Sequence, residues 1–248
     1  MTDEEKLLIK RFEELNSRSF NKGIWVYSDF LTTAQQAVLM NLKLGAVSFC
    51  GGYDGAERRV ACFGSEEMCG YEACPDCVWL AIEPVAKKFA DVLTHRDFFG
   101  SVMALGLRRE VLGDIIVYDN CGYLYCKESV GDYIKENLTQ VKHTTVKCRE
   151  VAAPPVESVA LPDEAEFVVA SERLDAVIAA VYNLSRSVCK EYVEKGSVSV
   201  NSILTENASR QLEAHDIVSV RGKGRFIYEG ILRETKKGKL RASIRVYK

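Results

Sequence analysis

One segment divides the sequence into two parts. Residues 150–166, EVAAPPVESVALPDEAE, contain five acidic side chains, no basic ones and three of the chain's five prolines. Such a stretch cannot bury enough apolar surface to pack into a core, and its prolines favour an extended backbone. The sequence therefore predicts a linker over 151–166, which separates a longer N-terminal part from a C-terminal domain of residues 167–248.

The net charge changes sign at the same place. Residues 1–166 carry 18 Lys/Arg and 26 Asp/Glu, a net charge of −8, whereas residues 167–248 carry 15 and 9, a net charge of +6. Within the basic part, residues 221–248 alone hold 10 basic and 2 acidic side chains. Basic charge concentrated at one end is typical of a module that binds a polyanion, and the alternative is a well-solvated hairpin surface.

Hydropathy and cysteine content predict a cytoplasmic protein without a membrane segment. No run of 18 apolar residues occurs, and the N-terminal MTDEEKLLIKRFEEL is too charged for a signal peptide. The nine cysteines are an odd number and too few for a disulfide scaffold, so reduced thiols in a cytoplasm are expected.

Four cysteines, Cys62, Cys69, Cys74 and Cys77, are close in the sequence. The C-x4-C-x2-C spacing of the last three raises a zinc or iron–sulfur hypothesis. A structural zinc site usually uses two close C-x2-C pairs, however, and only one pair exists here. Cys62 also falls within a predicted strand, where a small buried thiol is common. We therefore expect free thiols, no metal site and no cofactor.

The order of elements over 77–150 is that of a ferredoxin-like plait. Strands are predicted at 78–84, 114–119, 123–128 and 143–151, and helices at 98–107 and 130–141. Asp97 is the expected N-cap of the first helix. RNA-binding domains share this β-α-β-β-α-β order with many enzymes, so it does not define a function. Residues 1–76 are expected to form a small α/β domain, which makes the chain a member of the α+β class.

Two tyrosines of the predicted plait, Tyr123 and Tyr125, lie on one strand face, where RNA-recognition plaits stack bases. The Lys/Arg-Gly-aromatic signature of such plaits is missing. We therefore expect both side chains to be buried in the core.

The C-terminal domain contains four ordered blocks, SERLD (171–175), LSRS (184–187), KGSVSVN (195–201) and DIVSVRGKGR (216–225). Apolar spacing predicts two short helices over the first two blocks, and strands and a hairpin follow. Together the blocks resemble the αL-type RNA-binding motif named after small-subunit ribosomal protein four. His215 stands where the motif usually has glycine, which predicts a strained turn.

These blocks supply candidate phosphate ligands. Backbone N–H groups at the start of the second helix attract anions, Arg186 adds a bidentate donor, and the GKGR turn brings Lys223 and Arg225 beside flexible glycines. For Arg173 the alternative is an ion pair with Asp175. The candidate RNA-binding residues of this domain are Arg173, Ser185, Arg186, Ser187, Lys190, Lys195, Asn201, Arg221, Lys223 and Arg225.

A second resemblance spans nearly the whole chain. The strings SDFLTTAQQ (28–36), GGYDGAERR (51–59) and HRDFFGSVMALGLRREVLGDI (95–115) are similar to the bacterial YlmH family. The resemblance implies a ribosome-associated, non-catalytic protein, linked to rescue of stalled large subunits carrying peptidyl-tRNA and to cell division.

The last of these strings holds the remaining candidate residues. His95, Arg96, Arg108 and Arg109 fall at the two ends of one predicted helix and form a possible basic edge for RNA. The alternative is that Asp97 pairs with one of these arginines and fixes the loop.

These features predict a monomeric RNA-binding protein whose partner is rRNA, tRNA or both on the large ribosomal subunit. No catalytic residues are predicted, because the sequence has only three histidines and lacks a Gly-x-Ser-x-Gly motif, a Walker loop and a Gly-x-Gly-x-x-Gly motif. The alternatives are an RNA-modifying enzyme with an appended αL module, including a hydrolase centred on His95 and Asp97, and an interaction scaffold for cell division.

Overall fold

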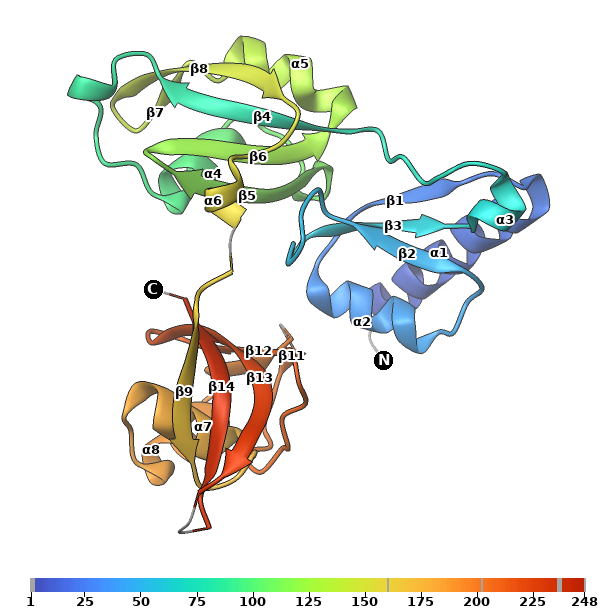
Figure 1. Cartoon of the computed structure of the whole chain (residues 1–248). Coiled ribbons are helices and arrows are strands. Elements are labelled where there is room, and N and C mark those ends of the chain that lie inside the picture. Colours follow the sequence, from blue (N-terminus) through green and yellow to red (C-terminus); the bar gives the residue numbers. More distant parts are fainter. Residues whose placement is uncertain (1–2, 160, 202, 236–237, 248) are drawn as a thin grey trace. The chain divides into compact units, whose positions relative to one another are not determined.

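The computed structural model describes residues 3–159, 161–201, 203–235 and 238–247. The chain forms two compact units, residues 1–160 and 161–248 (Figure 1). Both the predicted N-terminal domain (1–76) and the predicted plait (77–150) lie in the first unit. The boundary between them at residue 76 stays a prediction.

The first part of unit one is a three-stranded antiparallel sheet with helices packed on it. Its strand order is β1-β3-β2, and Phe12, Leu15 and Phe63 are buried in its core. The elements are α1 (Asp3–Lys22), β1 (Val26–Leu31), α2 (Thr33–Asn41), β2 (Val47–Cys50), β3 (Arg59–Phe63) and α3 (Glu66–Cys69). A capping box starts α2, in which Gln35 N donates to Thr32 Oγ1 at 3.3 Å and Thr32 N donates to Gln35 Oε1 at 2.8 Å.

The second part of unit one is the expected ferredoxin-like plait. Its antiparallel sheet has the order β5-β6-β4-β8-β7, and α4 and α5 pack on the same face through Phe98, Ile134 and Leu80. The elements are β4 (Cys77–Pro84), the 3-10 turn η1 (Lys87–Phe89), α4 (His95–Met103), the 3-10 turn η2 (Arg109–Val111), β5 (Leu112–Tyr118), β6 (Cys121–Lys127), α5 (Glu128–Asn137), β7 (Gln140–Val141), β8 (Thr144–Val151) and α6 (Val156–Val159).

Helix α4 begins earlier than the sequence predicts. Its N-cap is Thr94, and Asp97 is the third helical residue, whose carboxylate accepts hydrogen bonds from Thr94 N at 2.8 Å and Thr94 Oγ1 at 2.7 Å. The prediction of Asp97 as N-cap is therefore wrong. A Thr-x-x-Asp pattern places the acid one turn inside the helix, where its charge favours the helix N-terminus.

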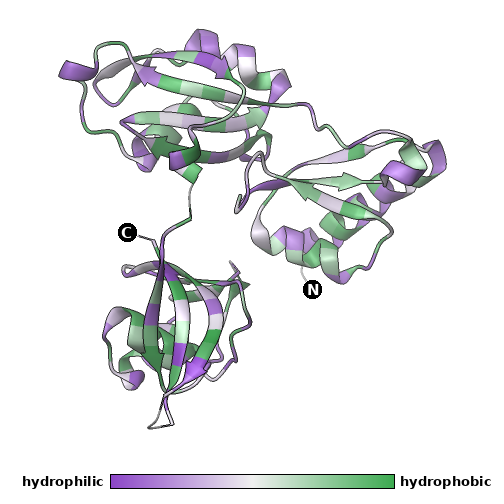
Figure 2. Cartoon of the chain, viewed as in Figure 1, coloured by the Kyte–Doolittle hydropathy of each residue, from purple (hydrophilic) through white to green (hydrophobic). Residues whose placement is uncertain are grey.

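The second unit packs two helices on one six-stranded antiparallel sheet of order β11-β10-β12-β13-β14-β9. Leu174, Val177, Cys189, Val198 and Phe226 are fully buried in its core. The elements are β9 (Glu164–Val169), α7 (Leu174–Tyr182), α8 (Arg186–Glu194), β10 (Val198–Val200), β11 (Ile203–Leu204), β12 (Asp216–Val220), β13 (Gly224–Glu234) and β14 (Leu240–Val246). Along β14 hydrophobic and hydrophilic residues alternate, as a strand with one buried face requires (Figure 2).

The predicted linker over 151–166 is wrong at both ends. Val151 still belongs to β8, α6 lies against β5, and β9 begins at Glu164. In β9 the residues Glu164 and Glu166 pair with Arg245 and Ser243 of β14. The composition of residues 150–166 did not indicate this strand, because its acidic side chains are neutralised by arginines that are distant in the sequence. The tip of the predicted hairpin, Lys236-Lys237, lies outside the described residues.

Across the described ranges, no helix has the length and apolar character needed to span a bilayer.

Candidate nucleic-acid interface

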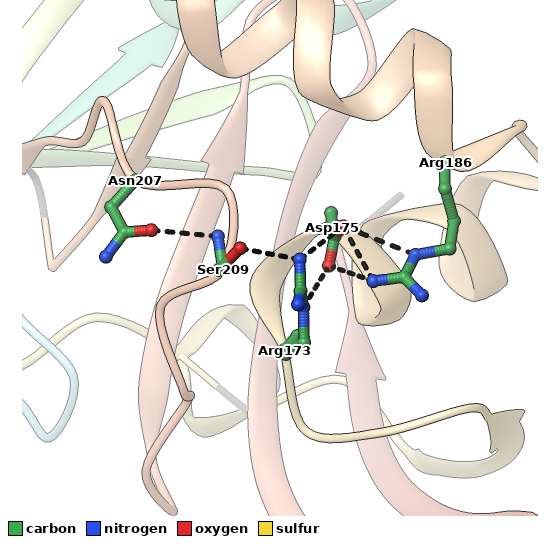
Figure 3. A network of polar contacts seen from close by, with 5 residues as sticks. All are labelled: Arg173, Asp175, Arg186, Asn207 and Ser209. Carbon is green, nitrogen blue, oxygen red and sulfur yellow. Dashed lines mark hydrogen bonds and ion pairs between the residues drawn. The ribbon is translucent and has the colours of Figure 1, made fainter.

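A buried carboxylate joins the starts of the two helices of the second unit. Asp175, in the first turn of α7, has no exposed surface. Arg173 Nε lies 3.1 Å from its Oδ1, and Arg186 Nη2 lies 2.7 Å from its Oδ2 (Figure 3). The ion pair of Arg173 with Asp175, one of the two expectations, is therefore present.

This pairing lowers the pKa of the buried acid. Burial alone raises the pKa of Asp175, but hydrogen bonds from Arg173 and Arg186 and their positive charges bring it below its ordinary value. Arg173 Nη2 also donates to Ser209 Oγ at 2.6 Å, and Ser209 N donates to Asn207 Oδ1 at 3.0 Å (Figure 3). Arg173 is thus held from two sides and acts mainly within the fold.

Arg186 keeps one side toward solvent. Its side chain is 47% exposed, and its Nε and Nη2 atoms are the ones that donate to Asp175. Ser185 caps α8, because its Oγ accepts from Val188 N at 3.3 Å, and it also lies 2.9 Å from Ser187 Oγ. Arg186 is therefore a cation of fixed position at a helix N-terminus, which is a favourable arrangement for an anion.

The turn between β12 and β13 adds exposed positive charge nearby. Arg221 and Lys223 are both exposed, and Gly222 and Gly224 have φ values of 76° and 127°, a backbone that glycine adopts without strain. A Cβ atom at Gly224 would lie 3.5 Å from the Tyr182 hydroxyl. The turn therefore adjoins the end of α7, three residues before the α8 cap. The guanidinium of Arg225 lies 4.4 Å from the centre of the Tyr247 ring.

The remaining candidates in this unit have different environments. Lys190 is exposed on α8, and Lys195 pairs with Glu191 at 3.2 Å. Asn201 has a φ of 51° and spans two strands, because its Nδ2 donates to Asp216 Oδ1 at 2.7 Å. Asn201 Oδ1 in turn accepts from the backbone N–H of residue 217 at 2.9 Å. Both polar atoms of the Asn201 side chain therefore form hydrogen bonds within the unit.

The turn at His215 is strained, as the sequence predicts for a position where the motif has glycine. Its φ is 70°, a left-handed conformation that costs a non-glycine residue free energy. Its Nδ1 lies 2.8 Å from Glu229 Oε2.

Acidic residues of β9 neutralise several C-terminal arginines. Glu166 Oε2 lies 3.0 Å from Arg233 Nη2 and 2.6 Å from Arg241 Nη1, and Glu164 pairs with Arg245. Much of the charge excess that the sequence assigns to 221–248 is therefore compensated in the fold. Among the described residues of 221–248, Arg221 and Lys223 of the β12–β13 turn and Lys239 form no ion pair.

In the plait, two of the four candidates meet at one aromatic ring. The guanidinium of Arg109 lies 4.9 Å from the centre of the Phe99 ring, and the His95 ring is parallel to Phe99 at 6.2 Å. Arg109 Nη1 also donates to the carbonyls of Leu112 and Gly113, each at 3.0 Å. Partial desolvation and the positive charge of Arg109 lower the pKa of His95 below its ordinary value.

The other two candidates, Arg96 and Arg108, are exposed. Asp97 uses its carboxylate in the Thr94 capping box, and it forms no ion pair with an arginine in the described part of the chain. The alternative, in which Asp97 pairs with one of these arginines, therefore does not occur in the structure.

Asp114 and Arg58 were not among the predicted site residues, although both belong to the strings quoted for the family resemblance. Asp114 Oδ2 accepts from Glu57 N at 2.7 Å and from Tyr53 Oη at 3.1 Å. Arg58 donates to the carbonyls of Phe30, Arg109 and Leu112 at 2.9–3.1 Å. The two strings therefore meet in space through these hydrogen bonds.

The open face of the plait sheet is covered. Tyr123 and Tyr125 are only 8% and 7% exposed, as the sequence predicts, and they pack in one cluster with Trp79 and Phe30. Because Phe30 belongs to β1, the N-terminal part of the unit occupies the surface on which RNA-recognition plaits stack bases.

The four clustered cysteines contain buried and exposed thiols. Cys62 is buried and Cys74 is exposed. Burial raises the pKa of Cys62 to about 12 and that of Cys77 to about 11, so both are protonated at neutral pH. Among the described residues, no three His, Cys, Asp or Glu side chains are arranged to hold a metal ion.

The plait has a closed sheet face, and in the second unit an exposed basic turn adjoins a two-helix motif. These features define a multidomain protein with a C-terminal αL-type module. Residues 80–154 match a family model described as a putative RNA-binding domain in YlmH. The chain is also 31% identical over 220 residues to the ribosome-associated protein quality control protein P2 of Bacillus subtilis (strain 168), an alignment that covers 87% of this chain and 85% of the relative. The chain belongs to the YlmH family.

A solved structure shows the same fold. The cell division protein YlmH from Streptococcus pneumoniae matches with a TM-score of 0.50 and 18% identity, over 64% of this chain and 97% of that one.

Proposed function

We propose that this chain is a non-catalytic RNA-binding protein that acts on the large ribosomal subunit, in the quality control of stalled ribosomes. It contacts rRNA, tRNA or both through its C-terminal module, and it works as a cytoplasmic monomer. The name of the Bacillus relative supports the ribosomal role, and the description of the matched family model supports RNA as the ligand.

The observation that carries the proposal is the position of the exposed cations. Arg221 and Lys223 lie on a glycine turn beside the end of α7, and Arg186 is held at the N-terminus of α8 by Asp175. Fixed cations beside free helix N–H groups bind a phosphate backbone by charge and shape. The tethered plait supplies a second contact, and two tethered weak sites raise the affinity through effective concentration.

A binding role also fits the surroundings of His95 and Asp97, the residues considered for a hydrolase. Asp97 is committed to the capping box of α4, and His95 is parallel to Phe99. Neither side chain orients the other, which a general base and its partner require. A scaffold for cell division is a second candidate, favoured by the name of the pneumococcal protein.

Co-sedimentation with ribosomal subunits tests the proposal. The variant Arg221→Glu/Lys223→Glu reverses the exposed cations and leaves the Asp175 network intact. Arg186→Glu is less suitable, because it places a second carboxylate beside the buried Asp175. A matched control, Lys10→Glu/Lys22→Glu, changes the net charge equally at exposed positions of α1.

We expect the wild type and the control to migrate with large subunits through a sucrose gradient, and the turn variant to stay at the top. A wild type that stays at the top overturns the ribosomal proposal. Equal loss in the control would show that net charge, rather than the turn, determines binding.

A further inference from the structure

The loop between β4 and α4 exposes apolar side chains that the core does not use. Phe89 is 84% exposed and Val92 is 83% exposed, and Phe89 is the most exposed large apolar side chain among the described residues. Full exposure of an aromatic ring is unfavourable in water, and on a binding protein such a ring often marks a contact surface.

Hydrogen bonds fix this loop in place. Asp91 N donates to Thr144 Oγ1 at 2.9 Å, and Leu93 N donates to Asn120 Oδ1 at 2.7 Å. Asn120 Nδ2 donates back to Asp91 O at 2.8 Å. The loop is therefore attached to the β5–β6 turn on one side and to β8 on the other, so the Phe89 ring is displayed from a defined backbone.

The acidic side chains around the loop all have partners. Asp119 pairs with Lys87 at 2.5 Å, Asp91 Oδ2 accepts from the His143 backbone N–H at 3.3 Å, and Asp97 accepts from Thr94.

Two nearby cations have no such partner. Lys88 extends over the Phe89 ring, 6.0 Å from its centre. Lys142 directly precedes His143, whose backbone N–H donates to Asp91 Oδ2 at 3.3 Å, so Lys142 lies at the same end of the plait as this loop. In the described part of the chain, neither Lys88 nor Lys142 forms an ion pair.

We propose that Phe89 is a stacking platform for an unpaired base of single-stranded RNA, with Lys88 and Lys142 as its phosphate contacts. This assignment rests on the proposed function and names a second RNA site, on the plait. The usual stacking face of such a plait is closed by Phe30 and its neighbours, whereas the Phe89 ring is open. An exposed aromatic flanked by cations is the arrangement that binds single strands without base specificity.

The charges favour RNA over a protein partner. The buried centre of a protein–protein contact is depleted in lysine, whereas Lys87 and Lys88 directly precede Phe89. A base stacks on the ring while the flanking ammonium groups reach the adjacent phosphates.

Phe89→Trp in the full chain gives a direct optical readout of stacking. The two natural tryptophans are 9% and 4% exposed, so the substituted side chain dominates the change in emission when RNA is added. The probe is an unlabelled mixed-sequence single-stranded RNA of 12 nucleotides, with the corresponding duplex for comparison. We expect strong quenching by the single strand and little by the duplex.

Binding measurements with the same single strand complete the test. Phe89→Ala should weaken the affinity by about 5- to 150-fold, the range for loss of one base–aromatic stack. Lys88→Glu/Lys142→Glu should also weaken it. The matched control is Phe20→Ala, which removes another exposed phenylalanine, on α1.

The outcomes separate this proposal from the proposed function. Loss of affinity in Arg221→Glu/Lys223→Glu, without quenching in Phe89→Trp or loss in Phe89→Ala, overturns the stacking site and leaves the proposed function intact. A wild type that binds no RNA overturns both. If Phe89→Ala binds RNA normally but no longer sediments with large subunits, the loop binds protein and the RNA assignment is wrong.

Discussion

Arg186 and Asp175 form a bidentate ion pair in which the acid is fully buried and the arginine is half exposed. Arg186 Nη2 lies 2.9 Å from one carboxylate oxygen and 2.7 Å from the other. Because Arg173 approaches the same carboxylate, one buried acid orients two cations at the starts of α7 and α8. Asp175 is thus a positioning residue, whose effect on a ligand acts through the arginines.

Asp175→Asn should therefore weaken the fold of the second unit. Removing one partner of a buried ion pair costs about 3 kcal/mol or more, because the remaining charges lose their counterion. Hydrogen exchange at the amides of α7 and α8 measures this cost as a lower free energy of opening. Lys190→Asn, an exposed change on α8, serves as the control. A change of less than about 1 kcal/mol in Asp175→Asn would contradict a structural role for the pair.

The ionisation of Asp175 should make the stability of the second unit depend on pH. The folded pKa of Asp175 lies below its ordinary value of about 3.9, so the ionised form stabilises the fold at every pH above that value. This contribution is lost as the pH falls through the folded pKa. The difference in opening free energy between the wild type and Asp175→Asn should be constant from pH 7 to pH 5 and should shrink below about pH 4. A difference that grows on acidification has the wrong sign for this ion pair.

His215 should respond to substitution through its backbone. His215→Ala removes the contact with Glu229 and keeps the left-handed strain, whereas His215→Gly removes both. We therefore expect the glycine variant to be more stable than the alanine variant by about 1 kcal/mol. Hydrogen exchange at the β12 amides measures the comparison. Equal stabilities would mean that the turn relaxes around alanine.

Arg58 should be important for the first unit, because it donates to three backbone carbonyls from β1, η2 and β5. Arg58→Ala removes three hydrogen bonds that join these elements and should lower the free energy of unfolding by about 3 kcal/mol. Arg58→Lys should recover roughly half at most, because one ammonium group cannot span the same carbonyls. Both tryptophans, Trp25 and Trp79, belong to this unit, so their fluorescence in urea measures its unfolding. Exposed Arg18 provides the control as Arg18→Ala, and full stability in Arg58→Lys would contradict the geometric argument.

The elements of the fold were predictable where local signals agree. The plait order, the burial of Tyr123 and Tyr125 and the strained turn at His215 all follow from periodicity and motif spacing. The linker prediction failed because composition is local, whereas the charges of Glu164 and Glu166 are compensated by arginines about 70–80 residues away.

The candidate site was predictable only as a set of residue types. Sequence spacing identified Arg186 and Lys223 as cations of the module, but it could not reveal that Asp175 holds Arg186 or that Asn201 is committed to Asp216. Such distinctions depend on contacts between distant segments. For the same reason the sequence could not separate the exposed cations of the β12–β13 turn from the paired arginines of β13 and β14.

The difference between exposed and paired cations leads to a quantitative prediction about how RNA affinity depends on salt concentration. Each phosphate neutralised on single-stranded RNA contributes about 0.7 to the slope of log affinity against log salt concentration, because bound counterions are released. Arg221→Ala/Lys223→Ala removes exposed cations, so the slope should become shallower by about 1.4. Arg233→Ala/Arg241→Ala removes the same formal charge, but both arginines are paired with Glu166 in the folded chain. Its slope should stay at the wild-type value. Fluorescence anisotropy with one labelled RNA over a range of salt concentrations measures all three slopes, and equal reductions in both variants would show that the paired arginines also contact phosphate.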